Sequence, residues 1–395
     1  MDLLECTIQP YAWGSRTAIA ELTGRDPTDR PEAEMWMGAH PLAPSRAAGV
    51  SLIERIERAP AAELGSEVVA RFGPRLPFLL KVLAAAQPLS LQAHPSPEQA
   101  RAGFEDEERR GVPRDAPHRN YKDPSAKPEL LCALGPFEAL CGFREPHATR
   151  ALFADLARLG ATELEPHVVW LDGRGGEGLR TAFANILELP RYRGAALASS
   201  VLAACQRYTG KYRRECAWAA RLGELYPGDV GAVTALFLDH VELQAGDAIY
   251  LGAGNLHAYL EGTAIEIMAS SDNVLRGGLT PKHVDVPELL RVLSFEPAHV
   301  APIHPTPIGP HEVAWATPAL DFRLSRVDLA EGEQARPERR GPEILLCVGG
   351  SARLVRDDGG APLDLARGAA AFVRAGDPGY VVEGAGSVFR ATVGG

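Results

Sequence analysis

The stretch LPFLLKVLAAAQPLSLQAHPS, residues 76–96, joins an apolar run around one lysine to an alternating pattern. In residues 88–95, apolar side chains alternate strictly with Ser90, Gln92 and His94. Strict alternation predicts a strand with one apolar and one polar face. We therefore expect a strand here that presents Gln92 and His94 on the same side of a sheet.

Residues 148–239 have a different character. Segments such as ATRALFADLARL and EGLRTAFANILEL place Ala, Leu and Arg at helical spacing, which predicts a helical block. Its last segment, PGDVGAVTALFLDHVEL (227–243), is expected to open with a cap at Asp229 and to continue the helical pattern.

Strand and turn patterns return from Val241 onward and continue through residues 311–395. There, short hydrophobic runs alternate with glycine turns about every 8–12 residues, which is typical of a sandwich or barrel. The chain of 395 residues is long enough for two or three domains. The order of patterns predicts a mainly β protein with an α-helical insert.

The composition, with 46% apolar and 23% charged residues, is that of a folded protein. A net charge of −10 argues against broad nucleic-acid binding, which needs a basic face. The apolar runs are shorter than the roughly 20 residues of a membrane span, and the first residues carry no signal-peptide pattern. Six scattered cysteines without a C-x-x-C motif indicate free thiols in a reducing compartment. We expect a cytoplasmic protein that binds neither nucleic acid nor membrane.

Four residues along the chain are of the types that bind zinc. Gln92 and His94 share a strand face, Glu129 stands beside a lysine before the apolar LLCAL run, and His257 follows a Gly-Asn turn. Taken singly, each is more often a structural or solvated residue. Together they offer an amide oxygen, a carboxylate and two imidazoles, which suits a catalytic zinc with an open position. Sequence spacing alone does not bring them together.

A turn-rich segment, ASSDNVLRGGLTPKHVD (269–285), gathers charged residues and glycines. Arg276 precedes two glycines, so it is placed to approach a phosphate or a developing oxyanion closely. The alternative is a solvated loop, which composition alone slightly favours.

Six segments, in the order in which they occur, resemble the type I phosphomannose isomerase family. The resemblance covers almost the whole chain, and its strength lies in the combination of segments rather than in any one of them. The segments are QPYAWGS (9–15), EMWMGAHP (34–41), LPFLLKVLAAAQPLSLQAHPS (76–96), YKDPSAKPEL (121–130), GNLHAYLEG (254–262) and EIMASSDNVLRGGLTPKHVDV (266–286).

The resemblance implies two cupin-like jelly-roll domains, with a helical domain inserted in the first. It places the catalytic cupin at residues 1–147 and 240–310, the helical insert at 148–239 and a C-terminal cupin-like domain at 311–395. The first strand is expected to pair with the C-terminal domain. This organisation agrees with the β, α, β order of the patterns.

The resemblance also implies one zinc ion per chain, bound by Gln92, His94, Glu129 and His257. Arg276 matches the family's essential arginine. Further pocket residues that match by motif are Trp13, Lys81, Ser90, Lys127, Tyr259, Glu266, Asp272 and Lys282. One position departs from the family pattern, because Ala126 stands where a histidine usually precedes Lys-Pro-Glu.

The implied reaction is the reversible conversion of mannose 6-phosphate to fructose 6-phosphate, in which a proton moves from C2 to C1 through an enediol. Arg276 suits the enediolate or the phosphate as a permanent planar cation. Glu266, Lys127 and a water on the zinc remain open as the base. Candidates for the phosphate are Lys81, Ser90, Lys127 and Lys282. We expect a monomer whose partner is the sugar phosphate.

Two other functions fit parts of the pattern. One is a different cupin metalloenzyme, such as a phosphoglucose isomerase or a dioxygenase. A dioxygenase would use iron with two histidines and one carboxylate, and Gln92 argues against it together with the cations that suit a phosphate. A sugar-phosphate sensor without turnover should lack a ligand or Arg276, and all of these residues are present.

Overall fold

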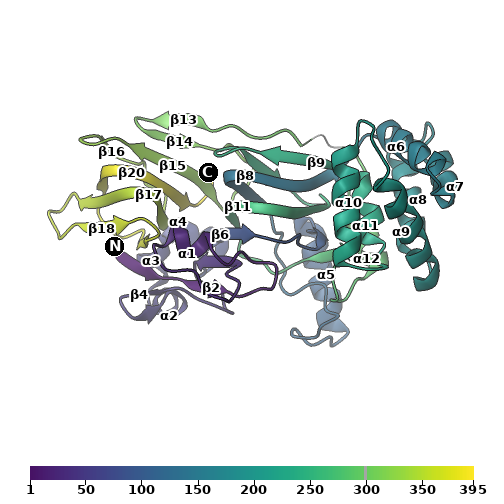
Figure 1. Cartoon of the computed structure of the whole chain (residues 1–395). Coiled ribbons are helices and arrows are strands. Elements are labelled where there is room, and N and C mark those ends of the chain that lie inside the picture. Colours follow the sequence, from purple (N-terminus) through teal and green to yellow (C-terminus); the bar gives the residue numbers. More distant parts are fainter. Residues whose placement is uncertain (298–299) are drawn as a thin grey trace.

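Figure 1 shows the computed structural model, which describes residues 1–297 and 300–395, as an elongated molecule. An eleven-stranded antiparallel sheet lies at one end, a nine-stranded antiparallel sheet lies in the middle, and a group of helices lies at the other end. The molecule is therefore mainly β with a helical insert, as the sequence predicts.

The nine-stranded sheet carries most of the predicted site residues. Its main path runs β10-β8-β11-β6-β3-β2, while β7 pairs with β11 and β12, and β9 pairs with β8. Residues 76–96 form β6 and β7, which confirms the predicted strand around Gln92. The strands are β2 (Thr7–Gln9), β3 (Glu34–Met37), β6 (Phe78–Ala85), β7 (Leu91–Ala93), β8 (Glu129–Phe143), β9 (Leu238–Leu243), β10 (Ala248–Leu251), β11 (His257–Ala269) and β12 (Leu275–Gly278).

The eleven-stranded sheet combines both ends of the described chain. Strand β1 lies beside β19, with Leu3 opposite Ala371, so the expected pairing of the first strand is confirmed. Two more short N-terminal strands, β4 and β5, extend the same edge, which the sequence did not indicate. The strands are β1 (Asp2–Glu5), β4 (Arg46–Ala47), β5 (Val50–Ser51), β13 (Thr306–Gly309), β14 (Glu312–Ala314), β15 (Arg323–Leu329), β16 (Gln334–Ala335), β17 (Glu343–Arg356), β18 (Leu363–Ala366), β19 (Ala370–Val373) and β20 (Tyr380–Thr392).

The predicted helical block is present. It consists of α6 (Pro146–Arg158), α7 (Glu165–Trp170), α8 (Gly175–Leu187), α9 (Arg191–Cys205), α10 (Arg213–Leu225) and α11 (Gly231–Thr234), with the 3-10 helices η1 (Thr162–Leu164) and η2 (Ala235–Phe237). The other helices are α1 (Ala18–Leu22), α2 (Leu52–Arg58), α3 (Pro60–Leu64), α4 (Ser66–Phe72), α5 (Pro97–Arg109) and α12 (Val286–Val292).

The end of the helical block differs from the prediction. The helical block was expected to run to residue 239 and the strands to return at Val241, but the chain already enters β9 at Leu238. Strand β9 pairs with β8 from Leu243 to Leu238, and this pairing overrides the helical spacing of the segment. Asp229 lies one residue before the position that caps α11, although its carboxylate does accept a hydrogen bond from the Gly231 N–H.

The helices share one apolar core with the strands of the site. Phe153, Phe183 and Phe237 meet edge to face within it, and Leu91 of β7 and Leu275 of β12 belong to the same cluster. The helical block thus packs directly against the strands that carry Gln92 and Arg276.

All six cysteines are free thiols, and every one except Cys6 is buried. This confirms the expectation of unpaired cysteines. Among the helices of the described residues, none combines the length and the apolar character needed to cross a membrane.

Candidate metal and substrate site

Three neighbouring strands set Gln92 between His257 and Arg276. In the antiparallel ladders, Gln92 of β7 is directly opposite His257 of β11 on one side and Arg276 of β12 on the other. Residues directly opposite in such ladders project from the same face. The sheet register therefore aligns three of the predicted functional side chains in one row.

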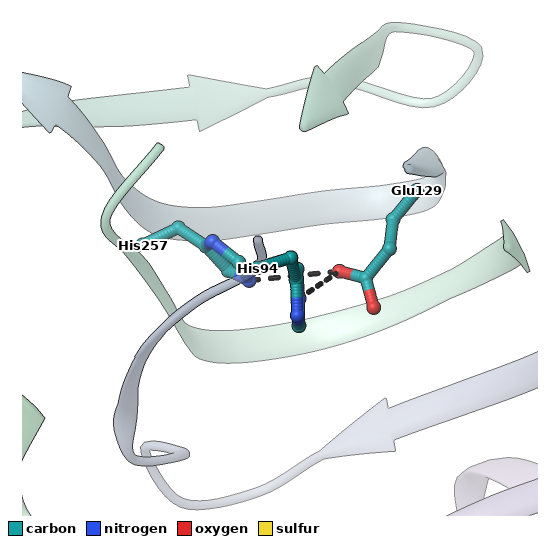
Figure 2. A group of neighbouring side chains, drawn as sticks. All are labelled: His94, Glu129 and His257. Carbon is teal, nitrogen blue, oxygen red and sulfur yellow. Dashed lines mark ion pairs between the residues drawn. The ribbon is translucent and has the colours of Figure 1, made fainter. Parts of the chain in front are cut away.

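His94, Glu129 and His257 form a tight group, shown in Figure 2, whose ligand atoms all lie within 4.8 Å of one another. The Glu129 Oε2 atom lies 3.3 Å from His94 Nε2 and 3.5 Å from His257 Nε2. All three residues are buried, with at most 2% of their surface exposed. These residues are far apart in the sequence but meet in the sheet, because β7 and β8 each pair with β11.

Hydrogen bonds on the far side of each imidazole orient it. The Nδ1 atom of His94 lies 2.8 Å from the Asn273 carbonyl oxygen, and the Nδ1 atom of His257 lies 3.1 Å from that of Asn255. A carbonyl oxygen only accepts, so the proton of each neutral ring belongs on Nδ1. Burial lowers the pKa of His94 and favours this neutral form. Each Nε2 lone pair is then directed at Glu129.

The inner atoms of the group lack hydrogen-bond partners. His94 Nε2, His257 Nε2 and Glu129 Oε2 are buried, and their contacts of 3.3 and 3.5 Å do not have hydrogen-bond geometry. Burying such acceptors without partners is costly. Two imidazoles and a carboxylate with free lone pairs are the donor set of a zinc site, so the residues present fit that ion, with Gln92 next to them in the register.

Lys127 supports the carboxylate of this group. Its Nζ lies 3.1 Å from Glu129 Oε1, the oxygen that faces away from the imidazoles. Burial alone would raise the pKa of Glu129, but the neighbouring imidazole of His94 and the charge of Lys127 hold it well below its usual range. Glu129 is therefore an anion, which is the form that binds a metal.

A second buried cluster, the Lys81 cluster (Glu34, Lys81, Tyr259 and Glu266), adjoins the first. Lys81 Nζ donates to Glu266 Oε2 at 3.0 Å and lies 3.5 Å from Glu34 Oε1, while the Tyr259 hydroxyl donates to Glu266 Oε1 at 3.0 Å. Burial would lower the pKa of Lys81, but the two carboxylates raise it, so the lysine stays charged. Burial raises the pKa of Glu266, against the opposing charge of Lys81.

Arg276 and Lys282 are cations without carboxylate partners among the described residues. Burial lowers the pKa of Arg276, and burial together with the charge of Arg276 lowers that of Lys282, so the two groups lie near one another. Lys282 also lines a cavity of about 830 Å³ between the helical block and the loop after β12. Unpaired cations of this kind suit an anionic group of a ligand.

The remaining predicted residues lie around these clusters. Trp13 packs against the apolar group that contains Tyr259, and Asp272 Oδ1 lies 3.1 Å from His40 Nε2. Ser90 is half-buried just before β7 and has no side-chain hydrogen bond in the described structure. The departure at Ala126 falls in the loop between Ser125 and Lys127, where it supplies no polar atom.

Sequence reasoning missed four supporting residues: Glu34, His40, Asn255 and Asn273. Asn273 is fully buried, and its side-chain amide bonds Lys122, Asp123 and Ser125 while its carbonyl accepts from His94. A usable signal existed only for Glu34, which is an acid inside the apolar run EMWM. His40, Asn255 and Asn273 support the site through contacts with other segments of the chain, which no local sequence pattern reveals.

Fold and site together define a metal-dependent enzyme of the cupin type, in which a buried group of metal ligands lies near cations that have no carboxylate partner. Residues 1–146 match the family model described as phosphomannose isomerase type I, catalytic domain. A mannose-6-phosphate isomerase of Shigella flexneri is 42% identical over 99% of both chains, and one of Arabidopsis thaliana is 32% identical over 89% of this chain and 84% of its own.

Solved structures agree with these relatives. The apo form of mannose 6-phosphate isomerase from Salmonella typhimurium superposes with a TM-score of 0.91 at 39% identity, covering 100% of this chain and 99% of that one. A mannose 6-phosphate isomerase bound with zinc and yttrium superposes with a TM-score of 0.89 at the same identity and coverage. The chain belongs to the type I phosphomannose isomerase family.

Proposed function

We propose that this chain interconverts mannose 6-phosphate and fructose 6-phosphate with one zinc ion bound by Gln92, His94, Glu129 and His257. The observation that carries the proposal is the group of three buried ligand atoms without hydrogen-bond partners. The zinc found in a structural neighbour supports the choice of ion. When bound, zinc acts as a Lewis acid on the sugar's carbonyl and on the negative charge that develops there.

The chain's own residues then have to move two protons. The base removes the proton from C2 of the open-chain aldose while O1 gains a proton, which leaves an enediol; O2 then loses its proton as C2 becomes the ketone, and the base returns a proton to C1. We assign this base to Glu266, because it is the buried carboxylate held by Lys81 and Tyr259 next to the metal group, and burial raises its pKa. Tyr259, whose pKa burial raises well above 10, stays protonated and donates to Glu266 throughout.

Cations at the site take up the remaining negative charge. Lys81 stays charged between Glu34 and Glu266 and fixes the position of the base. Arg276 and Lys282 lack carboxylate partners among the described residues, so they are available to the phosphate or the enediolate oxygens. Trp13, Ser90, Lys127 and Asp272 complete the wall of the pocket.

A coupled assay for fructose 6-phosphate from mannose 6-phosphate tests the proposal. It is run on the purified protein, after chelation, and after zinc is added back. Turnover that chelation abolishes and zinc restores supports both the reaction and the metal. A folded, zinc-loaded protein without turnover contradicts the reaction, and tight binding of mannose 6-phosphate in that case favours the sensor function.

The wider organisation is proposed along the same lines. Residues 1–147 and 240–310 form the catalytic cupin, 148–239 the helical insert, and 311–395 the C-terminal cupin-like domain.

The family's small-molecule reaction needs no second subunit, so we propose a cytoplasmic monomer. Light scattering on the eluting protein tests the monomer, and a dimer would contradict it.

A further inference from the structure

We infer that Asp229, at the end of the helical block, is a positioning residue for Arg276. The inference rests on the proposed function, in which Arg276 holds negative charge on the sugar phosphate. It assigns a role in the reaction to the helical block, which otherwise contributes no residue to the metal group.

The carboxylate of Asp229 joins two segments of the chain. Its Oδ1 accepts from the Gly231 N–H at 2.7 Å, within the helical block. Its Oδ2 accepts from the Leu279 N–H at 2.8 Å, three residues after Arg276. A carboxylate that accepts two backbone N–H groups forms two charge-assisted bonds and fixes both segments.

The backbone after Arg276 has a conformation that needs such support. The β12 ladder has an irregularity between Arg276 and Gly278. Gly278 then has a φ of 127° and Leu279 a φ of 58°, which is unusual for a residue with a branched side chain. Leu279 is buried with 1% exposure, so its N–H would lose its partner without Asp229.

Close backbone contact reinforces the link. A Cβ atom on Gly278 would lie 2.9 Å from the Gly231 Cα and 3.0 Å from Asp229 Oδ1. A Cβ atom on Gly231 would lie 2.8 Å from the Leu279 nitrogen. Glycine at both positions lets the helical block touch the loop at the point where Asp229 bonds it.

Arg276 depends on this backbone because its side chain is not anchored. In the described part of the chain, no carboxylate pairs with the guanidinium, whose pKa is lowered by burial alone. Its position is therefore set by the ladder to Gln92 on one side and by the Asp229 bond on the other. Loss of the second support shifts the charge relative to the substrate.

The test is a double-mutant cycle between Asp229→Ala and Arg276→Ala on the full-length, zinc-loaded protein. A small displacement of a positioned charge lowers turnover by about 10- to 100-fold, so we expect such a loss of kcat in D229A with zinc content and melting temperature close to wild type. In the R276A background, D229A should change kcat by less than about twofold, because effects that act through one group are not additive. The inference would be overturned if the loss of kcat in the double variant equalled the product of the losses in the two single variants. It would also be overturned if D229A had the kcat of wild type.

Two further variants keep the test decisive. Asp229→Asn retains one acceptor oxygen and should lose less activity than D229A, and it replaces D229A if that protein does not fold. Asp285→Ala is the matched control, since the Asp285 carboxylate accepts from Glu288 N–H at 3.1 Å and from Asn120 at 2.8 Å, and among the described residues it has no hydrogen bond to residues 276–279. Its effect should multiply with that of R276A.

Binding of inorganic phosphate separates this inference from the proposed function. If the wild-type protein shows no isomerase turnover, the proposed function fails on its own. Calorimetry with phosphate then decides the inference, because D229A should weaken binding in the wild-type background and not in R276A. If R276A weakens phosphate binding, equal phosphate affinity in wild type and D229A would contradict the inference; if R276A leaves phosphate binding unchanged, Arg276 acts at the enediolate and the double-mutant cycle in kcat decides.

Discussion

The Lys81 cluster and a second cluster in the eleven-stranded sheet are built from nearly the same parts. In the second, the Arg390 cluster (Glu312, Glu343, Tyr380 and Arg390), Arg390 lies 3.1 Å from Glu312 and 2.7 Å from Glu343, and the Tyr380 hydroxyl donates to Glu343 at 2.5 Å. Each cluster thus has a buried cation between two glutamates, with a tyrosine bonded to one of them.

The two clusters differ in what they adjoin. Every carboxylate of the Arg390 cluster is paired, and Ser325 also donates to Glu312. Its buried atom without a hydrogen-bond partner is a donor, the Nε of Arg390, as is the Nε of the adjacent Arg339, which lies 3.6 Å from Glu343 Oε1. The Lys81 cluster instead lies beside His94, Glu129 and His257, whose partnerless atoms are acceptors. Buried ionic groups alone therefore do not mark a site, whereas partnerless acceptors that converge do, because they attract a cation.

The largest expected effect comes from removing a ligand. His257→Ala should lose zinc and lower kcat by at least about 10³-fold, because the variant removes one of the two imidazole ligands of the ion. Zinc content and the coupled assay measure this. The control is His240→Ala, since His240 pairs with Glu138 at 2.7 Å outside the site. Loss of zinc in H240A and not in H257A would contradict the ligand assignment.

Next in size is the loss of the proposed base. Glu266→Gln should keep zinc but lower kcat by about 10²- to 10⁴-fold, because an amide cannot accept the C2 proton. Turnover and the exchange of the C2 hydrogen with heavy water should fall together. Glu343→Gln makes the same change beside Tyr380 and should leave turnover intact. Normal exchange in E266Q would assign the base elsewhere.

A smaller effect is expected at Asn273. Its side-chain amide bonds the backbone of the loop from Lys122 to Ser125 and thereby fixes its own backbone carbonyl, which orients His94; alanine keeps the carbonyl but loses this support. Asn273→Ala should weaken zinc affinity by about 10- to 100-fold, as for other groups that orient ligands. Competition with a coloured chelator measures this. Asn120→Ala, which removes a loop contact to Asp285, should leave zinc affinity unchanged, and equal weakening in both would reduce Asn273 to a general structural role.

The smallest effect on turnover is expected in the Arg390 cluster. Arg390→Met leaves Glu312 and Glu343 buried without their cation, which should lower the free energy of unfolding by about 3–5 kcal/mol. Zinc content and kcat should remain near wild type under folding conditions. Urea unfolding followed by tryptophan fluorescence measures the loss. A variant as stable as wild type, or one that lost zinc, would remove the distinction between the two clusters.

The sequence revealed the residues whose types are chemically distinctive. The ligand residues appear in it as an amide, a carboxylate and two imidazoles, and the 76–96 pattern gives the strand that carries Gln92. The resemblance to the family predicted that these four residues bind one zinc ion together. Convergence itself depends on the register of β7, β8, β11 and β12, which pairs segments more than a hundred residues apart and leaves no local pattern.

The supporting residues were harder to predict for the same reason. Asn255 and Asn273 orient the imidazoles through backbone carbonyls, which every residue possesses. Asp229 was predicted only as a helix cap, and its second bond reaches fifty residues along the chain. The first residues of β9 were predicted within the helical block because their local spacing is helical, whereas the pairing with β8 that makes them a strand leaves no local pattern.

Pairing of β1 with β19 has a consequence for biosynthesis. Leu3 is synthesised long before Ala371, yet the two lie opposite one another in the sheet. During translation, before β19 is made, β1 has an unpaired hydrogen-bonding edge, and such edges are prone to pair with the wrong strand. Closure of this sheet therefore follows synthesis of β19 (Ala370–Val373), and a polypeptide that stops before residue 370 keeps an exposed strand by which cellular quality control can recognise it.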